Sequence, residues 1–257
     1  MPPPIVLSIA GYDPSSGAGV TADVQTIRAH GCYPLTCITA LTVQTTQAVR
    51  KVEPVEASIV RDTLRELAKD FDIGAVRVGM LGSGAVAKVV ADFLSGKAMK
   101  HIVLDPIVKS SSGADLIDKA GQKVIRERLV SLAEVITPNL DEAGALIGSA
   151  VRVAKDIYGA AQKLHSLGAR GVVITGGHRE EAIDLLSLQG RVDEFWAEKI
   201  ESRSTHGTGC AFATSIACEL AKGKPLREAV VAAKRFVRQA IERAEGVGKG
   251  TGPLKLI

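Results

Sequence analysis

The sequence predicts an α/β fold in which a mostly parallel central sheet carries helices on both faces. Short apolar runs that end in Gly, Asp or Asn alternate along the chain with segments of helical period. This alternation is typical of parallel strands joined by crossover helices. The length of 257 residues, with 46% hydrophobic and 23% charged residues, suits a full core. Because no repeat, low-complexity tract or linker interrupts the pattern, we expect residues 1–257 to form a single domain.

Six apolar runs are expected as strands of the parallel sheet: 5–10, 37–43, 75–78, 102–104, 135–136 and 171–175. Right-handed crossovers would bring their carboxyl ends to one edge of the sheet. Functional side chains are therefore expected in the loops that follow these strands. Two further runs, 182–188 and 191–197, flank Gln189-Gly190, which predicts a small antiparallel hairpin at the sheet edge.

Helices are expected where apolar residues recur with a period near 3.6. Val20, Val24 and Ile27 share one face of a helix over 20–30, and Pro54 suits the first turn of a helix that runs to residue 69. The remaining helices are expected at 84–94, 116–132, 141–147, 156–167, 209–222 and 226–243. The glycine-rich segment 246–252 is expected to be a loop or a mobile segment.

Charge and composition argue against several classes of function. Lys and Arg number 32 against 28 Asp and Glu, and these charges are scattered, so nothing resembles a nucleic-acid-binding arm. Aromatic residues make up 4%, too few for a stacking platform on single strands. No signal peptide or membrane-spanning stretch is recognised. The four cysteines form no C-x-x-C pair, so reduced thiols in a cytoplasmic protein are expected.

The strongest chemical signal is the string Thr205-His206-Gly207-Thr208-Gly209-Cys210, which leads directly into an apolar helix. Glycines allow several backbone N–H groups to face one point, and the helix dipole adds positive charge there, which suits a phosphoryl group in transit. Thr208 is expected to cap the helix, and Cys210 to have a lowered thiol pKa in its first turn. The alternative is an ordinary glycine turn with a buried cysteine.

A second glycine-rich segment, Gly11-Tyr12-Asp13-Pro14-Ser15-Ser16-Gly17-Ala18-Gly19, lies between the first strand and the first helix. It lacks the Lys-Ser/Thr ending of a P-loop and does not fit the dinucleotide fingerprint. Asp23 follows on the helix, and a lone Asp there is most simply a solvated surface carboxylate. By itself this segment indicates little more than a strand-to-helix turn.

A third segment, Thr137-Pro138-Asn139-Leu140-Asp141-Glu142, directly follows an expected strand. Pro and Asn end the strand and the acidic residues suit a helix N-terminus, which is a sufficient structural explanation. The functional alternative is that Glu142 holds Mg²⁺ through water or orients nucleotide phosphates. Asp105, at the end of the strand 102–104, is the natural second carboxylate, since Mg²⁺ prefers oxygen ligands and keeps several waters.

Taken together, the motifs resemble the hydroxymethylpyrimidine and phosphomethylpyrimidine kinases, a branch of the ribokinase superfamily. The matching segments follow one another in order between about residues 5 and 243. They are Ala10-Gly11-x-Asp13-Pro14-Ser15-x-Gly17-Ala18-Gly19 with Ala22-Asp23, Ala40-Leu41-Thr42-Val43-Gln44-Thr45-Thr46-Gln47, Gly79-Met80-Leu81, Leu104-Asp105-Pro106, Ile136-Thr137-Pro138-Asn139-x-x-Glu142, Gly176-Gly177-His178 and Thr205 to Cys210.

The resemblance implies a ribokinase-like three-layer α/β/α fold with a nine-stranded type of sheet, commonly a homodimer, that uses ATP and Mg²⁺. The implied reaction is phosphorylation of 4-amino-5-hydroxymethyl-2-methylpyrimidine, and of its monophosphate to the diphosphate, in thiamine biosynthesis. Gln44 would hydrogen-bond the aminopyrimidine, because an amide offers both donors and acceptors. Gly11, Asp23 and Met80 would line the same pocket.

The resemblance also implies catalytic and nucleotide-binding roles. Backbone amides of Gly207, Thr208 and Gly209 would stabilise the transferring phosphoryl group, while Cys210 orients or deprotonates the substrate hydroxyl. Sugar kinases of the superfamily have Asp where Cys210 stands, so the cysteine favours the pyrimidine branch. The ATP and Mg²⁺ side would use the residues that follow the later strands, namely Asp105, Asn139, Glu142 and Thr175, with Asp105 and Glu142 as metal ligands.

The sequence departs from the family pattern near the expected ATP phosphates. Family members often have Lys where Thr175 stands, and Lys109 is the hypothetical replacement for that positive charge. Two other functions stay open at this point. The nearest is a pyridoxal or pyridoxine kinase of the same branch, since both substrates are six-membered N-heterocycles with a CH₂OH group. The other is a nonenzymatic sensor that binds the pyrimidine.

Overall fold

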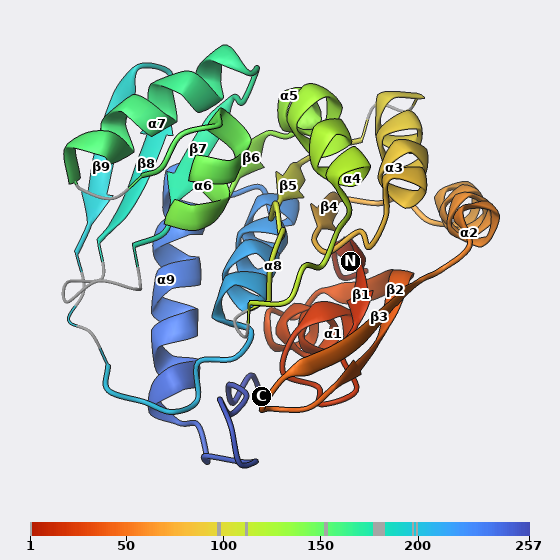
Figure 1. Cartoon of the computed structure of the whole chain (residues 1–257), viewed down its shortest axis with the longest axis horizontal. Helices are drawn as coiled ribbons and strands as arrows, with labels where there is room; N and C mark the ends of the chain where they lie inside the picture. The colour runs from red at the N-terminus through yellow and green to blue at the C-terminus, as the bar shows by residue number, and fades with distance from the viewer. Residues whose placement is uncertain are drawn as a thin grey trace.

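A single sheet of nine strands forms the centre of the computed structural model, which describes residues 2–96, 99–110, 113–151, 154–176, 183–196, 198 and 200–257. The strand order is β3-β2-β1-β4-β5-β6-β7-β8-β9 (Figure 1). The parallel strands are β1 (Ile5–Tyr12), β2 (Tyr33–Gln44), β4 (Ala75–Val78), β5 (Ile102–Leu104), β6 (Val135–Ile136) and β7 (Gly171–Ile174). The predicted α/β fold with a mostly parallel sheet is confirmed.

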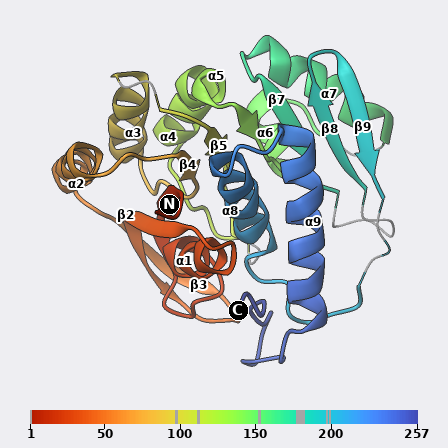
Figure 2. The same ribbon diagram turned by 180° about the vertical axis from the view of Figure 1, so that it is seen from behind.

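Helices cover both faces of the sheet because its strands are apolar on both sides. One face packs against α2 (Ala57–Asp70), α3 (Gly84–Gly96), α4 (Lys119–Val124), α5 (Val130–Leu132), α6 (Leu140–Ile147) and α7 (Ala154–Ser166). The other packs against α1 (Gly19–Ala29), α8 (Thr208–Ala221) and α9 (Leu226–Glu242), which lie together in Figures 1 and 2. On β4, Val76 and Val78 face the first group while Ala75 faces α8, as strand alternation requires.

The sequence analysis did not predict one strand of the sheet. This strand includes Pro54, which was expected to begin a helix. β3 (Val49–Pro54) pairs antiparallel with β2, and α2 begins only at Ala57. β3 has β2 as its only neighbour in the sheet, and a proline is tolerated in such an edge strand because it has no N–H to donate. The predicted helix start was wrong because proline suits a strand end as well as a first helical turn.

The helix expected over 116–132 is shorter and interrupted. Asp118 caps α4 by accepting a hydrogen bond from Gly121 N at 2.6 Å, so the helix begins at Lys119. A π-helical turn, η1 (Ile125–Leu129), then separates α4 from α5. The preceding strand, β5, ends at Leu104, so residues 105–118 separate it from α4.

The predicted hairpin is confirmed as β8 (Asp184–Leu188) and β9 (Arg191–Phe195), which pair antiparallel. Gln189 and Gly190 have φ of 51° and 77°, the left-handed pair that a two-residue hairpin turn requires. The outermost expected residues, Ala182 and Ala197, lie outside the described residues. Across the described part of the chain, no helix has both the length and the apolar character to cross a bilayer.

Candidate active site

The glycine loop after β1 packs directly against the segment that begins α8. A Cβ on Gly207 would lie 1.8 Å from Gly17 O, and a Cβ on Gly17 would lie 2.2 Å from the His206 ring. Gly19 has φ of 59°, and a Cβ there would lie 2.2 Å from Gly11 O. The two glycine-rich motifs, almost 200 residues apart in sequence, therefore form one backbone-lined surface that larger residues would push apart.

The N-terminus of α8 has no side-chain cap. Gly207 is the N-cap residue with φ of 85°, and Thr208 is the first residue of the helix, so the expectation that Thr208 caps it was wrong. A left-handed N-cap favours glycine, which offers no side-chain oxygen to the first-turn N–H groups. Those groups and the helix dipole therefore face the strand ends uncapped by side chains, as an anion site requires.

Cys210 lies in the first turn of α8, but its thiol is not activated. Burial, together with the charges of Asp105 and Asp23, raises the pKa of Cys210 to about 11, although Arg77 acts in the opposite direction. The expected lowering of this pKa was wrong because desolvation outweighs the helix dipole. Cys210 is therefore a neutral thiol near pH 7.

Beneath Cys210 lies an arginine that the sequence analysis did not single out. Arg77 on β4 is fully buried, and its guanidinium donates to Asp23 Oδ2 at 3.0 Å and to Asp105 Oδ2 at 2.5 Å. A Cβ on Gly79 would lie 2.0 Å from Arg77 Nη1, so the glycine makes room for the side chain. Burial by itself would lower the pKa of Arg77, but the charges of Asp23 and Asp105 raise it above its ordinary value.

Asp23 is neither a solvated carboxylate nor exposed toward a ligand in this structure. It is fully buried on α1, and it accepts hydrogen bonds from Ser8 Oγ at 2.5 Å, Thr214 Oγ1 at 2.7 Å and Arg77. The surface interpretation was wrong because α8 covers this face of α1. The Arg77–Asp23–Asp105 cluster joins β4, α1 and the loop after β5 below the anion site. A positive residue within the apolar strand Ala75–Val78 was the sequence signal for it, since a buried charge must be paired.

The pyrimidine end expected from the resemblance contains a second polar cluster. His206 Nε2 lies 2.7 Å from Asp13 Oδ2 and 3.1 Å from the side-chain amide of Gln44. Asp13 also accepts from Ser15 N, Ser15 Oγ and Ala18 N. Burial opposes ionisation of Asp13, but the hydrogen bonds from His206 and Ser15 hold its pKa below the ordinary value. The structure thus brings Gln44 next to the α8 segment, through His206.

Gly11 and Met80 meet beside this cluster. A Cβ on Gly11 would lie 2.9 Å from Met80 Sδ, and Met80 O accepts a hydrogen bond from Thr39 Oγ1 at 2.5 Å. Met80 is buried and packs with Ala40 and Leu116 in a small apolar cluster. Of the residues predicted to line one pocket, Gly11 lies against Met80 and Gln44 lies against His206, while Asp23 is fully buried and paired with Arg77.

The residues predicted for ATP and Mg²⁺ lie at the ends of β5, β6 and β7. Thr175 N donates to Pro138 O at 3.0 Å, which places Thr175 beside Asn139. Asn139 and Glu142 form a capping box, in which each side chain accepts from the other's backbone N–H at 2.9 Å. The structural explanation for Glu142 therefore holds, and it does not conflict with a metal role because a carboxylate has two oxygens.

The donor set here fits a hard cation. Asp105 and Glu142 are both buried, and burial together with the charge of Asp105 raises the pKa of Glu142 to about 8. Thr137 Oγ1, directly after β6, is buried and has no hydrogen-bond partner among the described residues. A cation that takes two carboxylates and completes its shell with water suits this arrangement. Larger clusters of three or more His, Cys, Asp or Glu are absent from the described residues.

Lys109 does not reach this group in the structure. It is exposed in the connection between β5 and α4, and its nearest acid is Asp115, with Lys109 Nζ 3.9 Å from Asp115 Oδ1. Its role toward ATP stays a prediction. Gly177 and His178, which belong to the Gly176-Gly177-His178 motif, lie outside the described residues.

Comparison with known proteins decides the family. A family model described as phosphomethylpyrimidine kinase matches residues 13–255. The chain belongs to this family. The hydroxymethylpyrimidine/phosphomethylpyrimidine kinase of Aquifex aeolicus is 39% identical over 248 residues, which are 96% of this chain and 97% of that protein.

Solved structures support the fold and also include a second vitamin kinase. The pyridoxal kinase of Bacillus subtilis, solved as an ADP complex, superposes with a TM-score of 0.91 at 33% identity, covering 98% of this chain and 97% of that one. The phosphomethylpyrimidine kinase of Clostridium difficile gives 0.83 at 30% identity, covering 93% and 99%. The resemblance inferred from the motifs is confirmed.

Proposed function

We propose that this chain transfers the γ-phosphoryl group of ATP to the hydroxyl of 4-amino-5-hydroxymethyl-2-methylpyrimidine, and then to the monophosphate, in thiamine biosynthesis. The observation that carries this proposal is the N-terminus of α8, free of a side-chain cap and flanked by Cys210, next to the Gln44–His206 pair. Membership of the phosphomethylpyrimidine kinase family supports the same reaction. It also makes the nonenzymatic sensor the weaker alternative.

In the proposed reaction the substrate hydroxyl oxygen forms a bond to the γ-phosphorus while the bond to the bridging oxygen of ADP breaks. Amides of Gly207, Thr208 and Gly209 receive the phosphoryl oxygens, since the helix terminus supplies donors and positive potential. Cys210 positions the hydroxyl as a neutral thiol, because a pKa of about 11 leaves little thiolate near pH 7. The hydroxyl proton therefore leaves to a phosphoryl oxygen or to solvent.

Substrate recognition is proposed for Gln44, with Gly11 and Met80 as the apolar floor of the pyrimidine pocket. Asp23 does not contact the substrate in this proposal. It pairs with Arg77, whose positive charge lies under Cys210. This charge is shared with two carboxylates, so it supports the anion site without presenting an isolated cation to it.

ATP binding is proposed along Asn139 and Thr175, with Asp105 and Glu142 as the ligands of Mg²⁺. The metal, when bound, would neutralise charge that develops between the β- and γ-phosphates. Asp105 remains tied to Arg77 in this arrangement, and Glu142 would give up its proton on metal binding because its pKa is raised to about 8. Lys109 is the proposed additional cation for the phosphates.

A second candidate function has an observation of its own. The pyridoxal kinase of Bacillus subtilis superposes on nearly the whole chain with a TM-score of 0.91, above the 0.83 of the pyrimidine kinase from Clostridium difficile. Pyridoxal also carries a CH₂OH group on a six-membered N-heterocycle. We therefore propose pyridoxal as the alternative acceptor, secondary to the aminopyrimidine because the matching family model is that of phosphomethylpyrimidine kinase and the Aquifex aeolicus pyrimidine kinase is 39% identical, against 33% for this pyridoxal kinase.

Two properties of the whole protein are also proposed. A homodimer is supported by the exposed apolar side chains of Ile38, Leu41 and Val43 along β2, which a second copy would cover. A reducing, cytoplasmic compartment is supported by the cysteines, all of which are free and buried: Cys32, Cys37, Cys210 and Cys218. Light scattering on the purified protein tests the dimer.

The reaction is tested by measuring ADP formation with the hydroxymethylpyrimidine, its monophosphate and pyridoxal, each supplied separately with ATP and Mg²⁺. Turnover of both pyrimidines at higher kcat/KM than pyridoxal is expected. Turnover of pyridoxal alone would keep the kinase mechanism but overturn the acceptor. Binding of the pyrimidine without any ADP formation would favour the nonenzymatic sensor over the kinase.

A further inference from the structure

His206 lies close to both Asp13 and Gln44. The two contacts cannot both be hydrogen bonds if the Gln44 amide nitrogen faces the His206 ring. The same ring nitrogen, Nε2, lies 2.7 Å from Asp13 Oδ2 and 3.1 Å from Gln44 Nε2. An imidazole nitrogen either carries one hydrogen or offers one lone pair. It can donate to Asp13 or accept from an amide N–H, and it cannot do both.

The surroundings of Asp13 determine whether His206 Nε2 donates or accepts a hydrogen bond. Its side chain has only donors around it: Ser15 N at 2.8 Å, Ser15 Oγ at 2.7 Å and Ala18 N at 2.9 Å. Its pKa is lowered, so it is a carboxylate that can only accept. His206 Nε2 must then carry the hydrogen and donate it to Asp13.

The atom of Gln44 that faces this N–H must consequently be an acceptor, which shares the single Nε2 hydrogen with Asp13 in a three-centre hydrogen bond. An amide has nitrogen and oxygen at nearly equivalent positions, so its partners determine which atom lies on which side. With Oε1 toward His206, the amide nitrogen faces Thr42 Oγ1 across a contact of 3.2 Å. Thr42 Oγ1 lies 2.9 Å from Tyr12 O and donates its own hydrogen there, so it accepts from the amide. Every donor then meets an acceptor.

We propose that His206 is a specificity-determining positioning residue: held by Asp13, it turns the Gln44 amide oxygen toward itself and fixes which donor and acceptor Gln44 presents to the acceptor ring. The proposal rests on the proposed function for the role of Gln44. A fixed amide offers one remaining N–H and one remaining lone pair in a set order. A substrate ring that presents its donor and acceptor in the opposite order leaves the Gln44 N–H or lone pair without a partner, and this lowers the binding affinity.

The coupling is tested by a double-mutant cycle on purified full-length protein, with kcat and KM measured for the hydroxymethylpyrimidine and for pyridoxal. His206→Leu removes the N–H and is expected to raise KM for the pyrimidine about tenfold, the loss of one hydrogen bond, with kcat within about twofold. His206→Gln restores a donor and is expected to recover most of the affinity. Gln44→Ala combined with His206→Leu is expected to lose no more than Gln44→Ala by itself.

The same variants separate this role from a structural one. The preference for the pyrimidine over pyridoxal is expected to fall in His206→Leu, whereas damage to the fold would lower turnover of both acceptors equally. Additive losses in the double variant, or an unchanged preference, would overturn the proposal. If the wild type phosphorylates pyridoxal alone, the proposed function fails, and the same cycle on pyridoxal still decides whether His206 acts through Gln44.

A measurement without any substrate completes the test. Two-bond ¹H–¹⁵N correlations of the His206 ring report which nitrogen carries the hydrogen in the ligand-free protein. Hydrogen on Nε2 is expected. A ring with hydrogen on Nδ1 and a bare Nε2 would place the Gln44 nitrogen toward it and overturn the inferred amide orientation, whatever the acceptor proves to be.

Discussion

The two ends of α8 each contain a buried charged cluster, but solvent reaches only one of them. At the N-terminal end, the side chains of Arg77, Asp23 and Asp105 are 0%, 0% and 5% exposed. At the other end, Glu219 is paired with Lys222 and Lys224, whose side chains are 30% and 45% exposed. Water can replace a lost partner at the second cluster and cannot at the first. Removal of a charged partner should therefore cost more stability at the N-terminal end of α8 than at its C-terminal end.

The two clusters also differ in the structural elements that they connect. Arg77 has carboxylates from α1 and from the loop after β5, so it connects separate elements below the anion site. Glu219 is bonded by His30 Nδ1 at 2.9 Å and by lysines from its own helix end. The first cluster fixes the relative positions of β4, α1 and the loop after β5, whereas the second joins α1 to the C-terminal end of α8.

The largest effect is expected for Arg77→Met. It leaves Asp23 and Asp105 buried without a cation, which costs about 3–5 kcal/mol in the free energy of unfolding. Urea denaturation followed by circular dichroism measures it. The control Arg227→Met removes an exposed pair with Asp193 and is expected to change stability by less than about 0.5 kcal/mol. Equal losses in both variants would erase the contrast between buried and exposed pairs.

Cys210→Ala is expected to lower kcat about a hundredfold, close to 2.7 kcal/mol, by removing the group that we propose to position the hydroxyl. Cys210→Ser keeps a polar group and is expected to retain at least about a tenth of the activity. Steady-state kinetics with the pyrimidine measure both. Near-normal turnover in Cys210→Ala would remove Cys210 from the mechanism, and an inactive Ser variant would favour a role for the thiolate.

Glu219→Gln tests the solvent-accessible cluster. Burial opposes ionisation, but the hydrogen bonds from Lys224, Lys222 and His30 lower the pKa of Glu219 to about 2 from 4.5. A lowered pKa stabilises the folded state above pH 4.5, and this contribution is lost as the pH falls toward 2. We expect the variant to be about 1–2 kcal/mol less stable at pH 7, after allowance for solvent screening of the lysines.

The pH dependence of that difference provides the check. Thermal or urea unfolding at several pH values should show the wild type and Glu219→Gln converging between pH 4.5 and 2. Glu53→Gln, on a pair that is fully exposed on β3, is the matched control and should show no such convergence. A difference that stays constant with pH would mean that Glu219 acts through packing and not through its charge.

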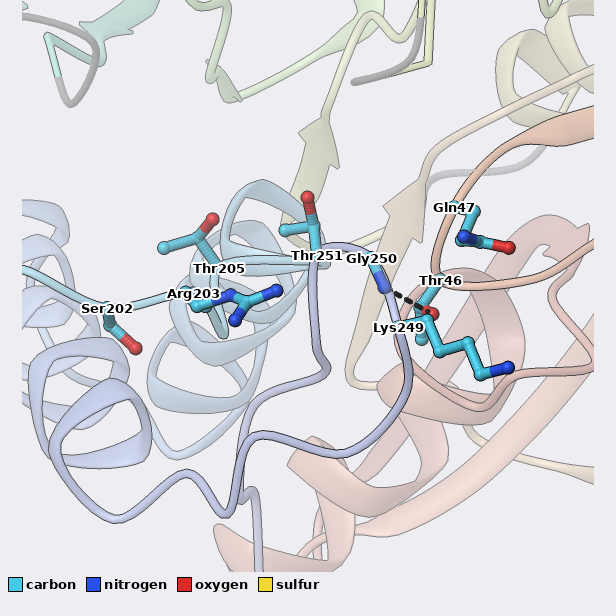
Figure 3. Close-up of a pocket in the computed structure, with 8 residues that line it drawn as sticks. All are labelled: Thr46, Gln47, Ser202, Arg203, Thr205, Lys249, Gly250 and Thr251. Carbon is cyan, nitrogen blue, oxygen red and sulfur yellow. Dashed lines mark hydrogen bonds between the residues drawn. The ribbon is translucent and has the colours of Figure 1, made fainter.

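The smallest effect is expected at the C-terminal tail, which supports the N-terminal end of α8. Gly250 N donates to Thr46 Oγ1 at 3.2 Å, Thr251 N donates to Thr46 O at 2.9 Å, and His206 N donates to Gly252 O at 3.0 Å. Figure 3 shows Thr46 and the Lys249–Thr251 stretch lining one polar cavity of about 500 Å³. The segment is therefore a loop, as expected, and it links the turn after Gln44 to the start of the α8 segment.

Gly250→Ala is expected to raise KM for the pyrimidine about three- to tenfold, because the added Cβ would lie 2.1 Å from Thr46 O and displace the tail. Gly159→Ala, where a Cβ meets nothing within 4 Å, is the control and should leave KM unchanged. Substrate titrations of both variants measure the effect. An unchanged KM for Gly250→Ala would show that the tail does not position Gln44 and His206.

The strand ends illustrate what could be predicted without a structure. Asp105, Thr137 and Thr175 each follow an apolar run, and parallel strands must deliver these positions to one edge. The Gln189-Gly190 hairpin was predictable for a similar reason, since only a few residue pairs accept two left-handed conformations. β3 was missed because an edge strand that ends in Pro54 has a weak alternating pattern and β2 supplies its partner groups.

The sequence by itself determined the parallel strands, the hairpin and the family, because strand periodicity, turn residues and ordered motifs are local properties of the chain. Tertiary structure decided that Arg77 is buried between Asp23 and Asp105, that Cys210 is a neutral thiol, and that His206 lies between Asp13 and Gln44. These outcomes depend on desolvation and on charges from distant segments. Both are set only when the helices close over the sheet.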